Sequence, residues 1–262
     1  MTMIRAAVVQ TDPVFGQVAA NLERALALVP RECDLAVLPE LFATGYQFRE
    51  RAELGGLAEP VPDGAICRRL RDHAAASGTT LVAGLAERAG DRVFNTAVLV
   101  RPDGSTDRYR KVHLFWDETR IFDPGDLGFP VFAACGTTVG LLVCFDWLFP
   151  EAAGTLARRG ARVLCHPSNL VLPHCPDAMP VRAFENRVFT LTANRVGAER
   201  RTGSELRFIG RSVIASPRAE RLVECSRTAA EAGSAVLDLA LCDPWITPLN
   251  HVTRDRRPEY YA

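Results

Sequence analysis

Lysine is almost absent from this sequence, although the chain is not poor in charge. Of the 31 basic residues among 262, Lys111 is the one lysine and the others are arginines. Lysine carries a compact ammonium ion whose pKa responds readily to burial, whereas arginine spreads its charge over a plane. Because this chain uses arginine at its other basic positions, Lys111 is a candidate for a role that requires an ammonium ion.

Net charge and long apolar runs are also missing. The 31 basic and 31 acidic residues cancel, which excludes a general electrostatic attraction to nucleic acid or an anionic membrane. No stretch approaches the roughly 18–20 apolar residues that a membrane-spanning helix needs, and the first ten residues lack a signal-peptide pattern. Hydrophobic residues make up 48% of the chain, too many for a disordered protein. We therefore expect a cytoplasmic globular protein that binds neither nucleic acid nor membranes.

The sequence also lacks paired cysteine motifs. Its eight cysteines are spread along the chain without a Cys-x-x-Cys pair. A chain of this length buries enough surface to fold without disulfides, so we expect buried free thiols. The pairs Cys165-His166 and His174-Cys175 offer four possible metal ligands, but their spacing matches no common zinc pattern. We expect neither a metal ion nor a cofactor, and metal analysis of the purified protein would test the alternative.

Short apolar runs alternate with amphipathic stretches along the chain, without a repeat or a long linker. The spacing of apolar residues predicts helices over 17–29, 63–77, 150–159 and 177–187. Strands are expected over 5–10, 34–38, 79–87, 93–101, 138–144, 162–165, 188–194, 206–215, 221–225 and 234–239. Helices interleave with strands early and several later strands follow one another directly, which favours an α/β fold with sheet packed on sheet. We expect one domain over residues 1–262, with an irregular tail from about residue 240.

Cys144 stands at the end of an apolar run, residues 139–143, and precedes an aromatic segment that leads into a predicted helix. A nucleophile in a sharp strand-to-helix connection is exposed to a cleft and lies near backbone N–H groups. The alternative is a thiol buried in the core, and position on the strand does not choose between the two.

Lys111 and Glu40 have unusually apolar neighbours for charged residues. Lys111 lies in the segment Tyr-Arg-Lys-Val-His-Leu-Phe-Trp (109–116), and Glu40 follows the apolar run 35–38 and a proline. A partly buried ammonium ion is stable only when it is paired, so a buried carboxylate should lie nearby. Glu40 is the candidate partner. The alternatives are a solvated surface lysine and a glutamate at a helix N-terminus.

Three segments around these residues resemble, in the same order, the signature blocks of the nitrilase superfamily of carbon–nitrogen hydrolases. They are Leu-Pro-Glu-Leu-Phe-Ala-Thr-Gly-Tyr (38–46), Tyr-Arg-Lys-Val-His-Leu-Phe (109–115) and Val-Cys-Phe-Asp-Trp-Leu-Phe-Pro-Glu (143–151). Segments 182–187 and 193–197 also resemble family segments. Three ordered blocks of this length are far more specific than one short motif.

The resemblance runs from residue 4 to about residue 240, so it covers most of the expected carbon–nitrogen hydrolase domain. The sequence around Cys144 and the segment His-Pro-Ser-Asn-Leu (166–170) are most similar to small archaeal-type nitrilases and aliphatic amidases. The resemblance implies a four-layer αββα sandwich of two mixed sheets with helices outside. It also implies a homodimer or a higher homo-oligomer.

A catalytic triad of Glu40, Lys111 and Cys144 is what the resemblance implies for the site. Cys144 would be the nucleophile and Glu40 the general base, while Lys111 and the backbone N–H of Phe145 would donate to the oxyanion. Glu118 matches a second glutamate of the family, which either positions groups or transfers protons.

Four residues within or next to the matched blocks are candidates for substrate binding, namely Tyr46, Trp116, Phe145 and Asn169; core packing is the alternative for the aromatic ones. The reaction implied is thiol-dependent hydrolysis of a non-peptide C–N bond in a small aliphatic nitrile or amide, within nitrogen compound metabolism. It would release ammonia and a carboxylic acid through a covalent thioester. Hydrolysis of an N-carbamoyl amide, acyl transfer and a non-catalytic regulatory role stay open, because the pocket chooses between them.

Overall fold

Two six-stranded mixed sheets form the centre of the protein, whose computed structural model describes residues 3–261. The first sheet has the order β14 (Glu231–Asp238), β1 (Met3–Gln10), β2 (Leu35–Val37), β3 (Thr80–Ala89), β4 (Arg92–Val100), β5 (Thr106–Arg110). The second has the order β13 (Arg221–Glu224), β12 (Val213–Ala215), β9 (Phe189–Ala193), β8 (Val163–Pro167), β7 (Thr137–Leu141), β6 (Val131–Ala134). Strands β1–β2–β3 and β7–β8–β9 pair in parallel, and the other neighbours are antiparallel.

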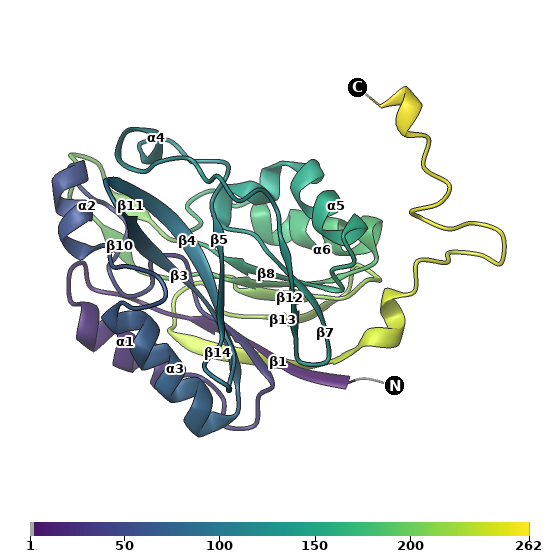
Figure 1. Cartoon of the computed structure of the whole chain (residues 1–262), viewed down its shortest axis with the longest axis horizontal. Helices are drawn as coiled ribbons and strands as arrows, with labels where there is room; N and C mark the ends of the chain where they lie inside the picture. The colour runs from purple at the N-terminus through teal and green to yellow at the C-terminus, as the bar shows by residue number, and fades with distance from the viewer. Residues whose placement is uncertain (1–2, 262) are drawn as a thin grey trace.

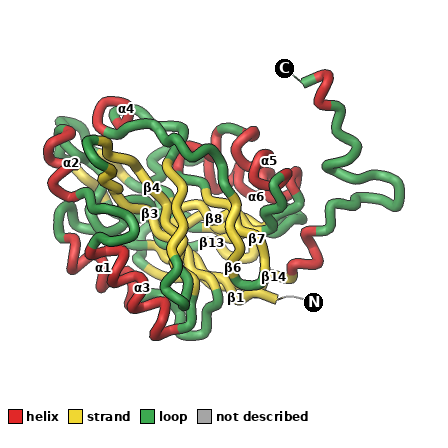
Figure 2. Tube along the Cα trace, viewed as in Figure 1, coloured by secondary structure: helices red, strands yellow, loops and turns green. Residues whose placement is uncertain are grey.

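Helices cover the outer face of each sheet (Figures 1 and 2). The first sheet carries α1 (Val18–Ala27) and α3 (Ala65–Ser77), and the second carries α5 (Pro150–Arg158) and α6 (Cys175–Asn186). One apolar cluster joins the facing sides of the two sheets, and others join each sheet to its helices. Strands buried on both faces read as continuous apolar runs, which is why the sequence revealed them. The fold is the four-layer αββα sandwich that the resemblance implied.

Two predicted strands were wrong in extent. The run 206–215 is divided into β11 (Leu206–Arg207), which pairs with β10 (Ala198–Glu199), and β12 in the second sheet. Gly210 and Arg211 between them have φ of 60° and 57°, a left-handed conformation outside the range of strands.

The strand predicted over 138–144 also ends early, at Leu141. Cys144 is the first residue of a short 3₁₀ helix, η1 (Cys144–Leu148). The thiol therefore lies in the turn after the strand. Side chains there need not point alternately to the two faces of the sheet, as they do within a strand.

Two short helices were not predicted, α2 (Arg51–Leu57) and α4 (Glu118–Ile121). α2 contains Gly55 and Gly56, and glycine lowers helix propensity by roughly 1 kcal/mol relative to alanine. Tertiary contacts therefore hold α2 where its own sequence disfavours a helix.

After β14, the 3₁₀ helix η2 (Leu239–Cys242) still packs on the sandwich, with Leu239 and Cys242 buried in the core. The segment that follows extends away from the sandwich (Figure 1), and up to residue 261 its regular structure is the 3₁₀ helix η3 (Pro258–Tyr260). Over the described residues 3–261, we find no helix with the length and apolarity that a membrane crossing requires.

Carboxyl ends of strands place the candidate residues. Because β5 is separated from β3 by one antiparallel strand, it runs in the same direction as β2 and β3. Glu40 and Lys111 follow the carboxyl ends of β2 and β5, so both lie at one edge of the first sheet. Cys144 and Asn169 follow the carboxyl ends of the parallel strands β7 and β8 in the second sheet.

Candidate active site

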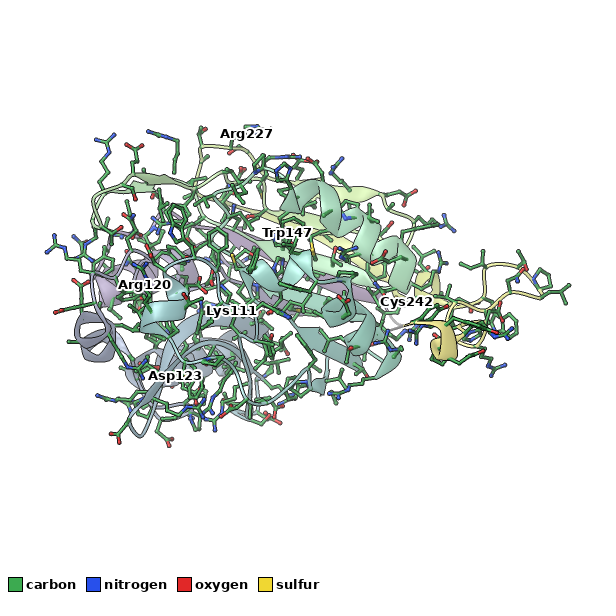
Figure 3. The ribbon with its side chains drawn as sticks, turned by 90° about the horizontal axis from the view of Figure 1, so that it is seen from above. Lys111, Arg120, Asp123, Trp147, Arg227 and Cys242 are labelled. Atoms are coloured by element: carbon green, nitrogen blue, oxygen red, sulfur yellow. The ribbon has the colours of Figure 1, made fainter. Side chains whose placement is uncertain are left out.

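Four ionisable side chains gather where these strand ends meet: Glu40, Lys111, Glu118 and Cys144, here called the charged cluster. Each is at most 5% exposed. Lys111 Nζ donates to Glu40 Oε1 at 2.8 Å and to Glu118 Oε1 at 2.8 Å, and Figure 3 shows Lys111 within the body of the molecule. The ammonium ion is therefore buried and paired with carboxylates, as its apolar neighbours indicated.

Two glycines permit the close backbone packing that positions this cluster. A Cβ atom on Gly84 of β3 would lie 2.4 Å from the Cα of Glu40. A Cβ atom on Gly125 would lie 2.1 Å from the carbonyl oxygen of Arg110, directly before Lys111. Glycine fits at both positions because it brings no side chain into the contact.

The turn that carries Cys144 is strained and tightly held. Cys144 has a φ of 43°, and such a conformation costs of order 1–3 kcal/mol in a residue other than glycine. Asp146 Oδ2 accepts hydrogen bonds from the Val143 N–H and the Tyr109 hydroxyl, both at 2.8 Å. Asp146 Oδ1 lies 2.7 Å from His113 Nδ1. Asp146 thus ties the cysteine turn to the chain on both sides of the lysine.

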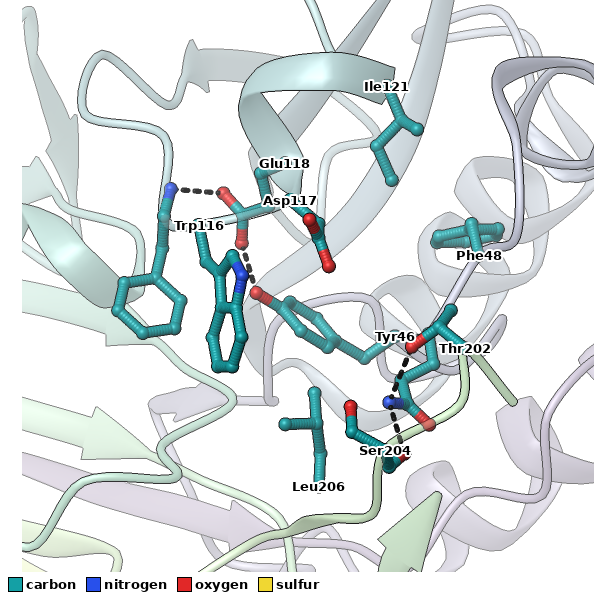
Figure 4. Close-up of a pocket in the computed structure, with 11 residues that line it drawn as sticks. Tyr46, Phe48, Trp116, Asp117, Glu118, Ile121, Thr202, Ser204 and Leu206 are labelled. Carbon is teal, nitrogen blue, oxygen red and sulfur yellow. Dashed lines mark hydrogen bonds between the residues drawn. The ribbon is translucent and has the colours of Figure 1, made fainter. Parts of the chain in front are cut away.

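Glu118 is fixed by donors to both of its oxygens. The Tyr46 hydroxyl donates to Oε1 at 2.7 Å, and the Phe115 N–H donates to Oε2 at 3.1 Å (Figure 4). Tyr46 is itself held by Glu199, which accepts from the N–H of Tyr46 at 3.1 Å and of Gln47 at 2.7 Å. These contacts leave Glu118 little freedom to rotate away from the ammonium ion.

Burial and mutual charge shift the pKa values in the cluster. Burial opposes the ammonium form of Lys111, but Glu118 and Glu40 outweigh it and hold the Lys111 pKa above its ordinary value. Burial raises the pKa of Glu118, Lys111 opposes this rise, and Glu40 adds to it. Burial also raises the pKa of Cys144 well above its ordinary value, and Glu40 adds to that rise while Lys111 opposes it. The resting sulfur is therefore a thiol, which needs a base to become a nucleophile.

Cys144 borders a cavity of about 120 Å³, here called the thiol cavity. Its walls are mainly apolar and include Phe115, Phe145, Trp147, Leu170 and Leu172. A cavity of about 150 Å³ holds benzene, so the thiol cavity has room for a small molecule only.

Asn169 is the amide-bearing residue of the same wall, and it is 3% exposed. Its backbone amide lies close enough to the Cys144 sulfur to work against the rise in the thiol pKa. Its side-chain nitrogen and oxygen are both buried and have no hydrogen-bond partner within residues 3–261.

The predicted pocket residues divide between two hollows. Phe145 and Asn169 line the thiol cavity, whereas Tyr46 and Trp116 line a neighbouring hollow that also reaches Glu118 (Figure 4). Phe115 borders both hollows. Trp116 is 63% exposed, so it lines the solvent-facing part of its hollow.

Sequence reasoning missed Asn95, whose side-chain N–H donates to Glu40 Oε1 at 2.6 Å. Asn95 lies in the apolar strand β4 and is fully buried. A polar residue within such a strand is a signal that could have identified it, because a buried amide requires a partner. Asp146 lay inside the third matched block, but its role appeared only when the fold brought Tyr109 and His113 to it.

His166 was considered as a metal ligand, and the structure gives it other contacts. Its Nε2 lies 2.8 Å from the carbonyl oxygen of Cys144, and burial lowers its pKa to about 4. The described part of the chain holds no group of three or more His, Cys, Asp or Glu side chains arranged for a metal ion. His166 therefore supports the cysteine turn as a neutral side chain.

A small apolar cavity beside a buried thiol, an ammonium ion and two carboxylates, built on an αββα sandwich, defines an enzyme class that acts on small molecules. The family model described as carbon-nitrogen hydrolase matches residues 5–247. The chain therefore belongs to the carbon–nitrogen hydrolases, the nitrilase superfamily.

Known relatives agree with this assignment. The chain is 47% identical over 264 residues to a nitrilase from Pyrococcus abyssi, covering 99% of each chain. It is 36% identical over 219 residues to an (R)-stereoselective amidase from a Pseudomonas species, covering 81% of this chain and 77% of that one. A carbon-nitrogen hydrolase from Helicobacter pylori has a similar structure, with a TM-score of 0.85, 27% identity, and coverage of 99% of this chain and 97% of that one.

Proposed function

We propose that this protein hydrolyses a small aliphatic amide or nitrile, with Cys144 as the nucleophile and Glu40 as the general base. This proposal rests on a difference in hydrogen bonding between the two carboxylate oxygens of Glu40. Oε1 accepts from Asn95 and Lys111, whereas Oε2 is buried without a partner in the described part of the chain. A buried carboxylate oxygen without a donor is available to accept the proton of a neighbouring thiol.

In the first step, Glu40 Oε2 takes the proton of Cys144 while the sulfur attacks the carbonyl carbon of the amide. One electron pair of the C=O bond moves onto oxygen. Lys111 Nζ lies within 2.8 Å of Glu40 Oε1 and of both Glu118 oxygens, and this ammonium ion is the proposed first donor to the oxyanion. The backbone N–H of Phe145 is the proposed second donor.

In the second step, the tetrahedral intermediate collapses and the C–N bond breaks. Glu40 returns its proton to the leaving nitrogen, ammonia departs, and a thioester remains on Cys144. Water then gives a proton to Glu40 and attacks the thioester, which releases the carboxylic acid, and the thiol recovers its proton. A nitrile would first form a thioimidate, which water converts to the same thioester with loss of ammonia.

Glu118 is assigned a positioning role in this scheme. Its Oε1 accepts from Lys111 and Tyr46, and its Oε2 accepts from Phe115. Both oxygens of Glu118 accept hydrogen bonds, whereas Glu40 Oε2 accepts none from the described residues. Glu118 therefore holds the ammonium ion in place while Glu40 moves the proton.

The size of the thiol cavity and the relatives support a small aliphatic substrate. About 120 Å³ accommodates a short acyl chain between apolar walls. Proteins at 47% and 36% identity are named a nitrilase and an amidase, so both substrate types belong in the first assay.

Ammonia release from short aliphatic amides and nitriles tests the proposed function. Replacement Cys144→Ala is expected to abolish release and to remove the acyl adduct that intact-protein mass spectrometry detects during turnover. Cys135→Ala is the matched control, because Cys135 is a partly buried thiol outside the charged cluster. Ammonia release by the Cys144→Ala protein at the unmodified rate would contradict the proposal.

A homodimer or larger homo-oligomer is also proposed. On α6, Val181 and Phe184 are each 51% exposed, and Leu148 nearby in η1 is 45% exposed. Exposed apolar side chains that cluster on one face often mark a protein interface. Light scattering on the purified protein would test this, and a mass near the single-chain 28.7 kDa would contradict it.

A further inference from the structure

We infer that the side chain of Asn169 is a binding site for a second carboxamide group of the substrate. This group would lie on the carbon next to the one that Cys144 attacks. The inference rests on the proposed hydrolysis, and it adds a class of substrate: short diamides and other amides that carry a second carboxamide.

The first observation is that Asn169 differs from the other buried asparagines. Asn194 accepts from the Leu170 N–H at 2.8 Å and donates to the Gly210 carbonyl at 2.6 Å. Asn21 is likewise paired through both its oxygen and its nitrogen, and Asn95 is paired through its nitrogen alone. Within residues 3–261, by contrast, both amide atoms of Asn169 are buried without a partner. Folded proteins pair nearly all such groups, so this exception requires an explanation.

The second observation is that the backbone holds Asn169 in place. The Ser168 N–H donates to the Ala193 carbonyl at 2.8 Å, and the Leu170 N–H donates to Asn194 Oδ1 at 2.8 Å. Residues on both sides of Asn169 are thus tied to β9 and to the segment that follows it. The side chain has little freedom to reach a partner in the protein, so it is presented to the cavity in a fixed position.

The third observation is its position relative to the sulfur. Asn169 and Cys144 line the same thiol cavity, and the Asn169 backbone amide lies close enough to the sulfur to work against the rise in its pKa. A substrate whose carbonyl carbon is in contact with this sulfur would therefore carry its next substituent within reach of the Asn169 side chain.

The chemistry of the wall selects the kind of substituent. Apart from the Cys144 thiol and the exposed His174, the other walls of the thiol cavity are hydrocarbon and aromatic, so Asn169 is the buried amide on an otherwise apolar surface. A carboxamide side chain offers both a donor and an acceptor in one plane. A second carboxamide pairs with both, whereas a nitrile or carboxylate only accepts and leaves Asn169 Oδ1 without a donor.

Two ligands of nearly equal shape separate this recognition from simple burial. Malonamide has a second carboxamide on the carbon next to the scissile group. In 3-methylbutanamide, two methyl groups replace the oxygen and nitrogen of that second carboxamide. Both ligands fill similar volumes, so a difference in affinity reports on polar pairing rather than on size.

The experiment measures both affinities by calorimetry with the full chain carrying Cys144→Ala, which removes the nucleophile. We expect malonamide to bind on the order of tenfold more tightly than 3-methylbutanamide, beyond the statistical factor from its two equivalent ends. Adding Asn169→Leu should make the two affinities equal. Adding Leu172→Ala, in the same wall, should weaken both ligands alike and leave their ratio unchanged.

Two results would overturn the inference: equal affinities in the Cys144→Ala protein, or a preference for malonamide that survives Asn169→Leu. Failure of malonamide to bind would overturn it as well. Asn169→Ala provides a second variant in case the leucine disturbs packing. Ammonia release by the chain with Cys144 intact tests the proposed hydrolysis separately, so the two failures are distinguishable.

Discussion

The two sides of Cys144 are built in different ways. On one side, Lys111 and Glu118 are held by several hydrogen bonds that come from the first sheet and the loop after it. On the other side, the second sheet presents an apolar wall in which the Asn169 amide has no partner among the described residues. The paired side fixes a geometry suited to one reaction, and the unpaired side leaves a contact for a ligand. The comparison assigns the proton transfer and charge stabilisation to one side of Cys144 and the choice of substrate to the other.

Replacing Lys111 would break the paired side and should have the largest effect. Lys111 is fully buried between two carboxylates, where a wider guanidinium does not fit. Loss of one oxyanion donor raises the barrier by roughly 3–4 kcal/mol, so Lys111→Arg should lower kcat for ammonia release about as severely as Lys111→Ala. Arg120→Lys, at an exposed position nearby, is the control. A mild effect of Lys111→Arg would refute the role given to the ammonium ion.

The acid limb of the pH profile tests Glu118 on the same side. Burial raises the pKa of Glu118 above its ordinary value of 4.5, so as the pH falls it becomes protonated earlier than a free glutamate. The protonated form no longer holds Lys111 by charge, and activity should decline at a pH above 4.5. In Glu118→Gln, kcat should fall about tenfold, because a charge-assisted hydrogen bond to Lys111 is weakened, and the acid limb should move to lower pH.

The control for this pH profile is Glu53→Gln, because Glu53 is paired with Arg201 away from the cluster. An acid limb at the same pH in the unmodified protein and in Glu118→Gln would show that another group titrates there. His166 is not expected to contribute above about pH 5, since burial lowers its pKa to about 4.

Tyr46 should show the smallest effect, because it acts on the ammonium ion through Glu118. Tyr46→Phe removes one hydrogen bond to Glu118 Oε1 and keeps the ring. The loss corresponds to about 1 kcal/mol, or roughly a fivefold decrease in kcat for every substrate. Tyr260→Phe, at an exposed ring, should leave the rate unchanged. Selective loss of one substrate in Tyr46→Phe would place Tyr46 on the substrate-selecting side.

The fold could be predicted where the residues of a single strand or helix are enough to identify that element. Buried strands such as β1 and β2 read directly as apolar runs, and α3 ends at Gly78, whose φ of 72° matches a glycine after a helix. Predictions were wrong where the backbone departs from a regular period. The left-handed conformations of Gly210 and Arg211 divide a predicted strand, and α2 forms despite two adjacent glycines because of tertiary contacts.

The site was predictable to the extent that its residues lie in recognisable segments. Glu40, Lys111 and Cys144 were identified that way, and the structure places them together. Asn95 could not be connected with Glu40 from sequence, because β4 reaches the cluster only through pairing in the sheet. Nor could the sequence divide Tyr46 and Asn169 between two hollows, since that division depends on how loops pack in space.

The ratio of kcat/KM for malonamide to that for 3-methylbutanamide tests the central comparison most directly. The account predicts that Tyr46→Phe lowers both values by the same factor and leaves the ratio unchanged. It predicts that Asn169→Leu lowers the ratio about tenfold. A ratio that Asn169→Leu leaves intact, or that Tyr46→Phe alters as strongly, would contradict the assignment of reaction and selectivity to opposite sides of Cys144.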